Sequence, residues 1–378
     1  MTIAITPAEL TLAIAGVAYV GQTLTVSGGV APYVWDVVGV PVGFTLTVNG
    51  TGTSAQLTSD TTAVDSGSPY TITVRLTDSN LDAVTQTFSL TVLPAGSILY
   101  DFGDGVVGAK IHANGGGKVA LTATVDPTAY VASTAVVYDT AQVLDYAKLY
   151  NNAKAYGAAL VKDNALVYGS AEVKGNAIVS GYAQAYDSAI VDGSSTLSGN
   201  CQVFNAAVVQ DSAILSGYSK LYGTATAMNN ASLTENCSAY GSATIAGSAR
   251  LFGSAQVFGD ATVQGTAQVS GNVKINGNAI VGQEAKLFGS ALIMDNASLL
   301  GAVNVSDTAT VRGNAQVLGQ AKIAGTAVVN GSAVVQGAAT VRGNARVTGT
   351  VIVQGSAVIE GTAEVSNLVI EGSTNINS

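Results

Sequence analysis

The stretch ALVYGSAEVKGNAIVSGYAQAY, from Ala165 to Tyr186, returns an alanine at every sixth residue. The same register extends in both directions, from Ala123 to Ala363, without a slip, and 34 of its 41 positions are alanine. The other seven are small or aliphatic: Ser195, Cys201, Ser219, Cys237, Val273, Val303 and Val351. Such a fixed period predicts one small structural unit repeated along most of the chain.

Two further columns share this six-residue register. Two residues after each alanine position, from Val125 to Val365, 37 of 41 residues are Val, Ile or Leu, and the residues between are mixed and mostly polar. This alternation is typical of a short β-strand. Two residues further on, from Pro127 to Asn367, stand 26 Gly, 7 Asp and 4 Asn, which accept the positive φ of tight bends. Each hexad therefore predicts a strand and a corner, and together they predict a solenoid rather than a meander.

Aromatic residues indicate how many hexads close one coil. Identical side chains in adjacent coils stack because parallel strands lie about 4.8 Å apart. Seven rings recur at intervals of eighteen residues: Tyr150, Tyr168, Tyr186, Phe204, Tyr222, Tyr240 and Phe258. Three hexads per coil place them in one file, so we predict a three-sided solenoid over residues 123–365, about 65 Å long at that spacing. The register fails after Val365, and residues 366–378 are interpreted as a C-terminal cap.

The run ATVRGNARVTGTVIVQGSAVIEGTAEV, from Ala339 to Val365, resembles hexapeptide-repeat proteins. The resemblance extends over roughly residues 123–365. It implies a left-handed parallel β-helix with three flat sheets, and the left hand is taken from the family alone.

The first 94 residues have a different composition, with Thr-rich alternating stretches and the only Trp, so we expect a separate domain. Five segments bounded by Gly, Pro, Asn or Asp predict strands of a β-sandwich: residues 24–28, 33–38, 44–48, 70–78 and 85–93. The words GGVAPYVWDV (Gly28 to Val37) and YTITVRLTDSN (Tyr70 to Asn80) resemble bacterial and phage immunoglobulin-like domains, which implies a spacer, anchor or adhesive module. Residues 95–122, rich in Gly, are interpreted as a linker and the N-terminal cap of the solenoid.

The sequence argues against an enzyme. Many hexapeptide-repeat proteins are acyltransferases with a catalytic His, and others bind zinc through three His, but this chain has one, His112, ahead of the regular coils. The solenoid also lacks the inserted loop that shapes the active site in those enzymes. Cys201 and Cys237 stand in the inward alanine column, two coils apart, which is too far for a disulfide. We therefore expect no catalytic residue, metal or cofactor.

The aromatic ladder, defined as the seven rings of the eighteen-residue file, is the candidate binding site. It follows the inward aliphatic position, so it lies on the outside or at a corner, where the rings either cover one another structurally or contact a ligand. A companion column two residues earlier carries Lys148, Leu166, Gln184, Gln202, Lys220, Ser238, Gln256 and Lys274. Aromatic rings beside amides and amines favour a glycan or a protein partner. Ice binding is disfavoured because only Thr226, Thr244 and Thr262 stack consecutively.

Charge and targeting signals narrow the function. The net charge is −9 with no basic cluster, which disfavours nucleic acid. The start, MTIAITPAEL, shows no secretory signal and no apolar run reaches membrane-spanning length. The leading hypothesis is a bacteriophage virion surface protein, made in the host cytoplasm, that contacts other virion proteins and a host glycan or receptor. The alternatives are a bacterial surface adhesin or envelope scaffold and, disfavoured, a hexapeptide acyltransferase. A homotrimer is expected only by analogy with the transferases.

Overall fold

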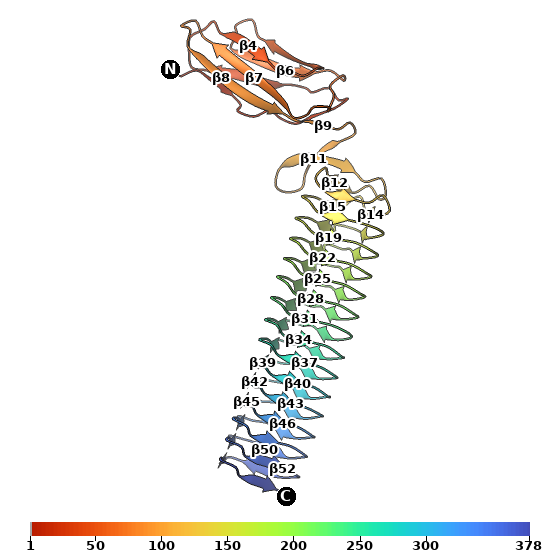
Figure 1. Ribbon diagram of the computed structural model, residues 1–378, viewed down its shortest axis with the longest axis vertical. Coiled ribbons are helices and arrows are strands. Elements are labelled where there is room, and N and C mark those ends of the chain that lie inside the picture. Colours follow the sequence, from red (N-terminus) through yellow and green to blue (C-terminus); the bar gives the residue numbers. More distant parts are fainter. Residues whose placement is uncertain (1) are drawn as a thin grey trace. The chain divides into compact units, whose positions relative to one another are not determined.

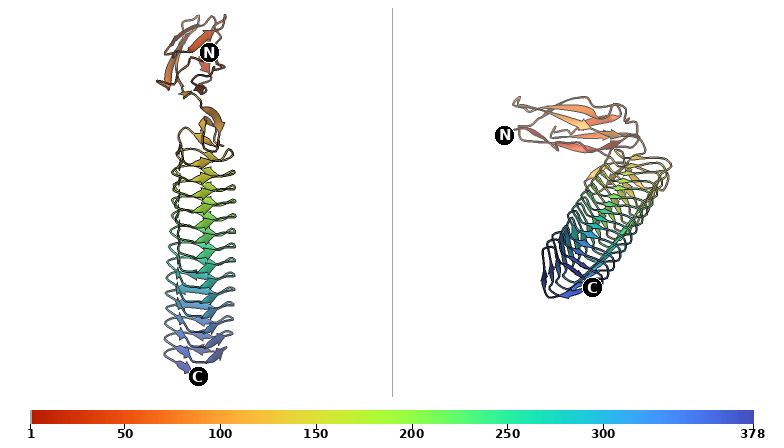
Figure 2. Two further views of the ribbon diagram at one scale, coloured as in Figure 1. Left: turned by 90° about the vertical axis from the view of Figure 1, so that its right-hand side faces the viewer. Right: turned by 60° about the horizontal axis from the view of Figure 1, so that its bottom comes forward.

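The computed structural model describes residues 2–378, and within that range the secondary structure consists of strands without a helix (Figures 1 and 2). The chain divides into two compact units, Met1–Ile111 and His112–Ser378. Each unit has a core of its own. The all-β class predicted from the sequence is confirmed.

Two antiparallel sheets form most of the first unit. One has the strand order β1 (Ala4–Thr6), β3 (Gln22–Ser27), β6 (Ser54–Ser59) and β5 (Phe44–Val48). The other has the order β4 (Val34–Val38), β7 (Tyr70–Thr77) and β8 (Ala83–Leu90). A parallel pair joins β2 (Ala13–Ile14) to β9 (Val92–Leu93), and a hairpin joins β10 (Ile98–Asp101) to β11 (Val106–Ile111).

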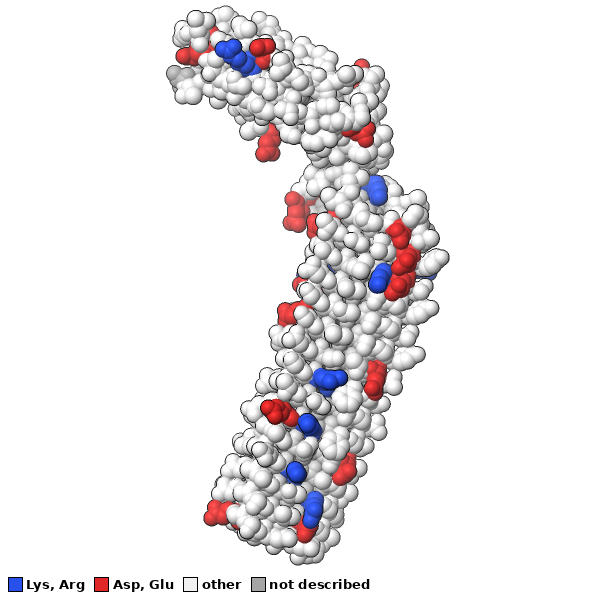
Figure 3. Space-filling model, in the orientation of Figure 1, with Lys and Arg blue, Asp and Glu red and all other residues white. Residues whose placement is uncertain are grey.

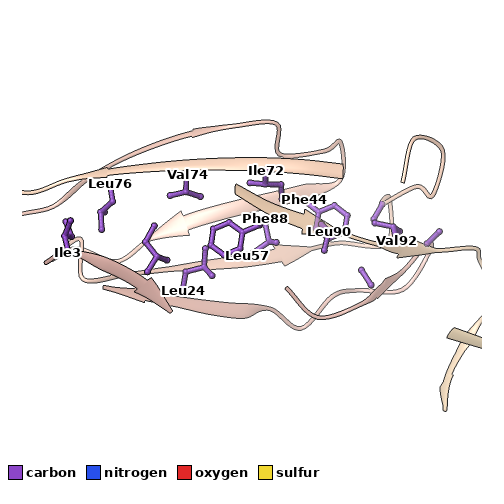
Figure 4. Close-up of a cluster of buried hydrophobic side chains, with 14 residues drawn as sticks. Ile3, Leu24, Phe44, Leu57, Ile72, Val74, Leu76, Phe88, Leu90 and Val92 are labelled. Atoms are coloured by element: carbon purple, nitrogen blue, oxygen red, sulfur yellow. The ribbon is translucent and has the colours of Figure 1, made fainter. Parts of the chain in front are cut away.

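A shared apolar core lies between the two sheets (Figure 4). Leu24 and Leu57 come from one sheet, and Ile72, Val74 and Phe88 from the other, and all five are buried. In β7 the buried residues alternate with more exposed ones, as a strand with one face on a core requires. Two sheets closed over one core are compatible with the predicted sandwich, and all five predicted segments fall on strands.

The second unit is a parallel β-solenoid with three sheets, each gaining one strand per coil. The β12 sheet runs from β12 (Lys118–Ala120) and β15 (Val136–Val137) to β51 (Ile352–Val353) and β54 (Val369–Ile370). The β13 sheet runs from β13 (Thr124–Val125) and β16 (Gln142–Val143) to β52 (Val358–Glu360) and β55 (Asn375–Asn377). The β14 sheet runs from β14 (Tyr130–Val131) and β17 (Lys148–Leu149) to β50 (Arg346–Thr348) and β53 (Glu364–Ser366). Fourteen strands in the β14 sheet correspond to fourteen coils.

Strand pairing confirms the three-sided winding. Val131 pairs with Leu149, and Leu149 with Val167, each step being eighteen residues in parallel register. The two inward columns form the core, and from Ala129 to Ile359 their members are 0–1 % exposed. Because alanine alternates with a larger aliphatic residue on each strand, the three walls close tightly around the axis.

The corner column adopts the bend predicted for it. Every residue of this column from Asp139 to Asn367 has a positive φ, whether glycine or not. At several corners an acidic side chain also bonds to the next coil. Asp163 has a φ of 60°, and its Oδ2 accepts a hydrogen bond of 2.9 Å from the backbone N–H of Gly181. Asp and Asn therefore both tolerate the left-handed backbone and link successive coils.

Residues 366–378, interpreted above as a cap, continue the winding. Ile352 pairs with Val369, a step of seventeen residues rather than eighteen, and Ile359 pairs with Ile376. The loss of one residue is absorbed at the corner, where Asn367 has a φ of 55° and its Oδ1 accepts a hydrogen bond from the Thr350 N–H. The last two strands, β54 and β55, thus pair in parallel with strands of the preceding coil.

Candidate binding surface

The aromatic ladder lies along the corner that leaves the β14 sheet. Each ring directly follows a strand of that sheet, as Tyr168 follows β20 (Leu166–Val167) and Tyr186 follows β23 (Gln184–Ala185). Six of the seven rings, from Tyr168 to Phe258, form one continuous stack with centroids 4.7–4.9 Å apart and planes within 7°. Tyr150 packs against Tyr130, with centroids 4.9 Å apart and planes 38° apart.

Stacking determines which parts of these rings a ligand can reach. The six stacked rings are half-buried, and burial is the main cause that raises the pKa of Tyr168, Tyr186 and Tyr222. Each inner ring has a neighbouring ring on both faces, so its edge is the part that remains available. The ladder therefore presents ring edges, not ring faces, to a partner.

The companion column lies on the outward side of the β14 strands. Gln184 and Gln202 are half-buried, and the Gln202 Nε2 donates a hydrogen bond of 3.4 Å to the Gln184 Oε1. Lys148 and Lys220 are more exposed. The strand face beside the ladder thus offers amides and ammonium groups, in the order expected from the sequence.

A second set of tyrosines lies at the opposite corner, where the chain enters the β14 sheet. Tyr146, Tyr182 and Tyr218 recur every thirty-six residues and are 61–63 % exposed. Sequence reasoning missed them because it followed an eighteen-residue interval, at which these tyrosines alternate with asparagines. A search at twice the coil length would have found them.

A cluster of charges lies on the outside of the β12 sheet. Glu172 bonds to Lys154 at 3.0 Å and accepts a hydrogen bond of 2.9 Å from the Tyr156 hydroxyl. Lys174 lies 3.9 Å from Glu172 and 3.8 Å from Asp192. Burial would raise the pKa of Glu172, but the hydrogen bonds from Lys154 and Tyr156 and the two lysine charges outweigh it, so the pKa is lowered. Figure 3 shows further basic side chains that follow one another along the lower part of the solenoid, with acidic side chains to either side.

The residues considered for chemistry are buried, whereas the ladder lies on the outside of the solenoid. His112 is buried, and its Nε2 lies 2.9 Å from the Ala129 carbonyl oxygen. Cys201 and Cys237 are fully buried in the inward column, and burial raises the pKa of both thiols to about 12. Among residues 2–378 no three His, Cys, Asp or Glu side chains form a group that could hold a metal ion. The same range has no helix long and apolar enough to cross a membrane.

Comparison with known proteins agrees with the solenoid geometry. The family described as the YdcK beta solenoid repeat matches residues 267–283, a segment that contains β37 (Gln268–Val269) and β38 (Lys274–Ile275). No curated protein matches the chain. The match and the fourteen coils together support a β-helix protein.

Proposed function

We propose that the protein is a non-enzymatic structural and adhesive protein of a bacteriophage virion surface, as a fibre, a spike or a capsid decoration. The observation that carries this proposal is the unbroken register of the solenoid, in which coil follows coil with short corners and no inserted loop from Ala123 to Ala363. Such a solenoid is held by contacts between neighbouring coils and acts as an extended scaffold. Runs of similar side chains lie in register over several coils, as in the six stacked rings of the aromatic ladder, which suits repeated contact with a surface.

In this proposal the two units have different roles. The first unit attaches to other virion structural proteins, because its segments resemble immunoglobulin-like spacer and anchor modules and its strands enclose a core of their own. The solenoid then projects and meets a host glycan or receptor, with the aromatic ladder as one candidate contact. The protein is made in the host cytoplasm and reaches the exterior by virion assembly.

A homotrimer fits the chemistry of the β12 sheet. Six consecutive coils carry an outward β-branched residue on this face: Ile190, Val208, Thr226, Thr244, Thr262 and Ile280. A flat, uncharged strip of this kind is suited to packing against other copies of this chain, and the number three is taken from the resemblance to the trimeric transferases. Light scattering coupled to size-exclusion chromatography tests this point; we expect three times the chain mass, and a monomer at micromolar concentration would contradict the trimer.

The decisive experiment is mass spectrometry of virions purified from the source phage, with immunogold labelling to locate the protein. We expect peptides from both units in the particle. A bacterial surface adhesin or envelope scaffold is the alternative, and the same solenoid would serve it. Peptides found in the envelope of uninfected cells, and in no particle, would support the adhesin and remove the virion role.

A further inference from the structure

The corner that enters the β14 sheet carries a strict alternation of tyrosine and asparagine over six coils. We call the following residues the Tyr/Asn column: Tyr146, Asn164, Tyr182, Asn200, Tyr218 and Asn236. All six are exposed, the tyrosines by 61–63 %. This column lies at the opposite end of each β14-sheet strand from the aromatic ladder.

The tyrosine faces in this column are free, unlike those of the ladder. Successive tyrosines are two coils apart, about 9.6 Å at the strand spacing of a parallel sheet. Ladder rings, in contrast, lie 4.7–4.9 Å apart and cover one another. Within residues 2–378, the side chains of Tyr146, Tyr182 and Tyr218 make no hydrogen bond and no ring contact, and the three asparagine side chains make no hydrogen bond.

The column is not required to hold the corners together. The backbone N–H of Tyr182 already donates to the Gly199 carbonyl, and that of Asn200 to the Gly217 carbonyl, both at 2.7 Å. Other residues at the same corner position use their side chains for the fold. Thr308, for example, donates its hydroxyl to the Gly325 carbonyl of the next coil at 3.2 Å. Tyrosine makes no such link, so its exposed ring is available to a molecule outside the chain.

Charge indicates the kind of ligand. Between Tyr182 and Tyr218 the remaining corner residues are Ser and Gly, which carry no charge. Charges of both signs flank the column, since Asp145, Asp163 and Glu235 are matched in number by Lys148, Lys162 and Lys220. The column therefore has no net charge that would favour a charged chain, and its phenol and amide groups suit an uncharged chain with hydroxyl groups.

We propose that the Tyr/Asn column binds an uncharged, extended, β-linked polysaccharide. The electron-rich faces of the tyrosine rings stack against the C–H faces of alternate sugars, and the asparagine amides exchange hydrogen bonds with hydroxyls of the sugars between. In an extended β-1,4-linked chain every second sugar turns the same face to the protein, which matches a ring at every second coil. The proposal deepens the adhesive part of the proposed function and rests on it.

Purified full-length protein tests the proposal by isothermal titration calorimetry. The probes are cellohexaose and chitohexaose, with maltohexaose as an α-linked control and hexagalacturonate as an anionic one. We expect binding to at least one β-1,4-linked hexasaccharide, weaker binding to its trisaccharide, and no binding to either control. Equal or better binding of hexagalacturonate, or no binding of either β-linked hexasaccharide, would overturn the proposal.

Tyr182 and Phe288, two exposed rings at different corners of the solenoid, provide a matched comparison. Tyr182→Ser should weaken hexasaccharide binding by about tenfold, the upper end of what one aromatic stacking contact contributes. Tyr182→Phe should keep the affinity, because the ring face is retained. Phe288→Ser removes an exposed ring that follows β40 (Lys286–Leu287) of the β13 sheet, outside both columns, and should leave the affinity unchanged. An equal loss in Tyr182→Ser and Phe288→Ser would overturn the assignment to this corner.

The outcome is separable from the virion role. Calorimetry on the isolated protein does not depend on where the protein resides, whereas mass spectrometry of particles does not depend on glycan binding. Binding without presence in virions would retain this site and reject the virion role. Presence in virions without hexasaccharide binding would retain the virion role and reject this site.

Discussion

Tyr186 and Phe204 stack with their ring centroids 4.8 Å apart and their planes within 1°. This separation equals the spacing of neighbouring strands, so the backbone of the solenoid determines how the rings meet. The pair belongs to a stack in which Phe204 has a ring on each face, while Phe258 has only Tyr240. Comparing Phe204, which takes part in two stacked pairs, with Phe258, which takes part in one, therefore measures how much one stacked pair contributes to stability.

Phe204→Ala should lower the stability of the solenoid more than Phe258→Ala does. One aromatic pair contributes about 0.5–1.5 kcal/mol beyond buried area, and Phe204 takes part in two pairs. We expect Phe204→Ala to lose about 0.5–1.5 kcal/mol more unfolding free energy than Phe258→Ala, measured by guanidinium denaturation. Equal losses for the two variants would mean that the ladder does not stabilise the fold through stacking, and would leave ligand contact as its remaining role.

Glu172→Gln should destabilise the protein at neutral pH and not in acid. The pKa of Glu172 is lowered in the folded state, so its contribution is present above the ordinary carboxyl value of 4.5 and is lost as the pH falls through the folded pKa. Because the side chain is 24 % exposed and Lys154 is 45 % exposed, we expect only about 0.5–1 kcal/mol.

Thermal melting of the wild type and of Glu172→Gln, recorded from pH 7 to pH 3, measures this contribution. The two melting temperatures should converge at the acid end. Glu364→Gln is the control, since Glu364 is 75 % exposed and lies 3.6 Å from Arg346. A difference for Glu172→Gln that persists at pH 3 would contradict the carboxylate origin of the effect.

Much of the solenoid could be predicted from the sequence because each coil repeats the same constraints. The inward columns and the eighteen-residue interval specify which residue stacks on which, and Leu149 pairs with Val167 as that interval requires. The Tyr/Asn column was not predicted because its tyrosines occur only in every second coil, with asparagine in the coils between. What the ladder presents to a ligand also could not be read from spacing alone, since Tyr150 leans on Tyr130 instead of continuing a parallel stack.

Strand β6 and the last coil of the solenoid were not predicted, each for a local reason. In the first unit, strand β6 has the sequence SAQLTS, with few β-branched or aromatic residues, and it is held by pairing with β3 and β5 on either side. At the other end of the chain, one missing residue hid the last coil from a six-residue search. Pairing with the preceding coil still determines its position, as the Ile359–Ile376 pair shows.

Asp163→Ala should cost more than Asp163→Gly. Alanine loses the hydrogen bond to the Gly181 N–H and must also hold a φ of 60°, which adds roughly 1–2 kcal/mol for a residue with a Cβ and no polar group. Glycine loses only the hydrogen bond. Asp163→Asn should be close to wild type, because the Asn205 Oδ1 accepts the Gly223 N–H in the same way. Melting temperatures of the three variants give the order of stability. Equal melting temperatures for Asp163→Ala and Asp163→Gly would contradict backbone strain at this corner.

Ser219→Ala should stabilise the solenoid. The Ser219 hydroxyl lies in the inward column, is fully buried, and has no hydrogen-bond partner among the described residues. A buried hydroxyl without a partner costs about 1–3 kcal/mol, and alanine is the residue that most positions of this column already use. Guanidinium denaturation should show a higher midpoint for Ser219→Ala and a lower one for Ala225→Ser, which introduces the same defect at the neighbouring inward position. Serine and alanine differ only by the hydroxyl group. A lower midpoint for Ser219→Ala would therefore show that this hydroxyl makes a favourable interaction inside the coil, and would contradict the prediction.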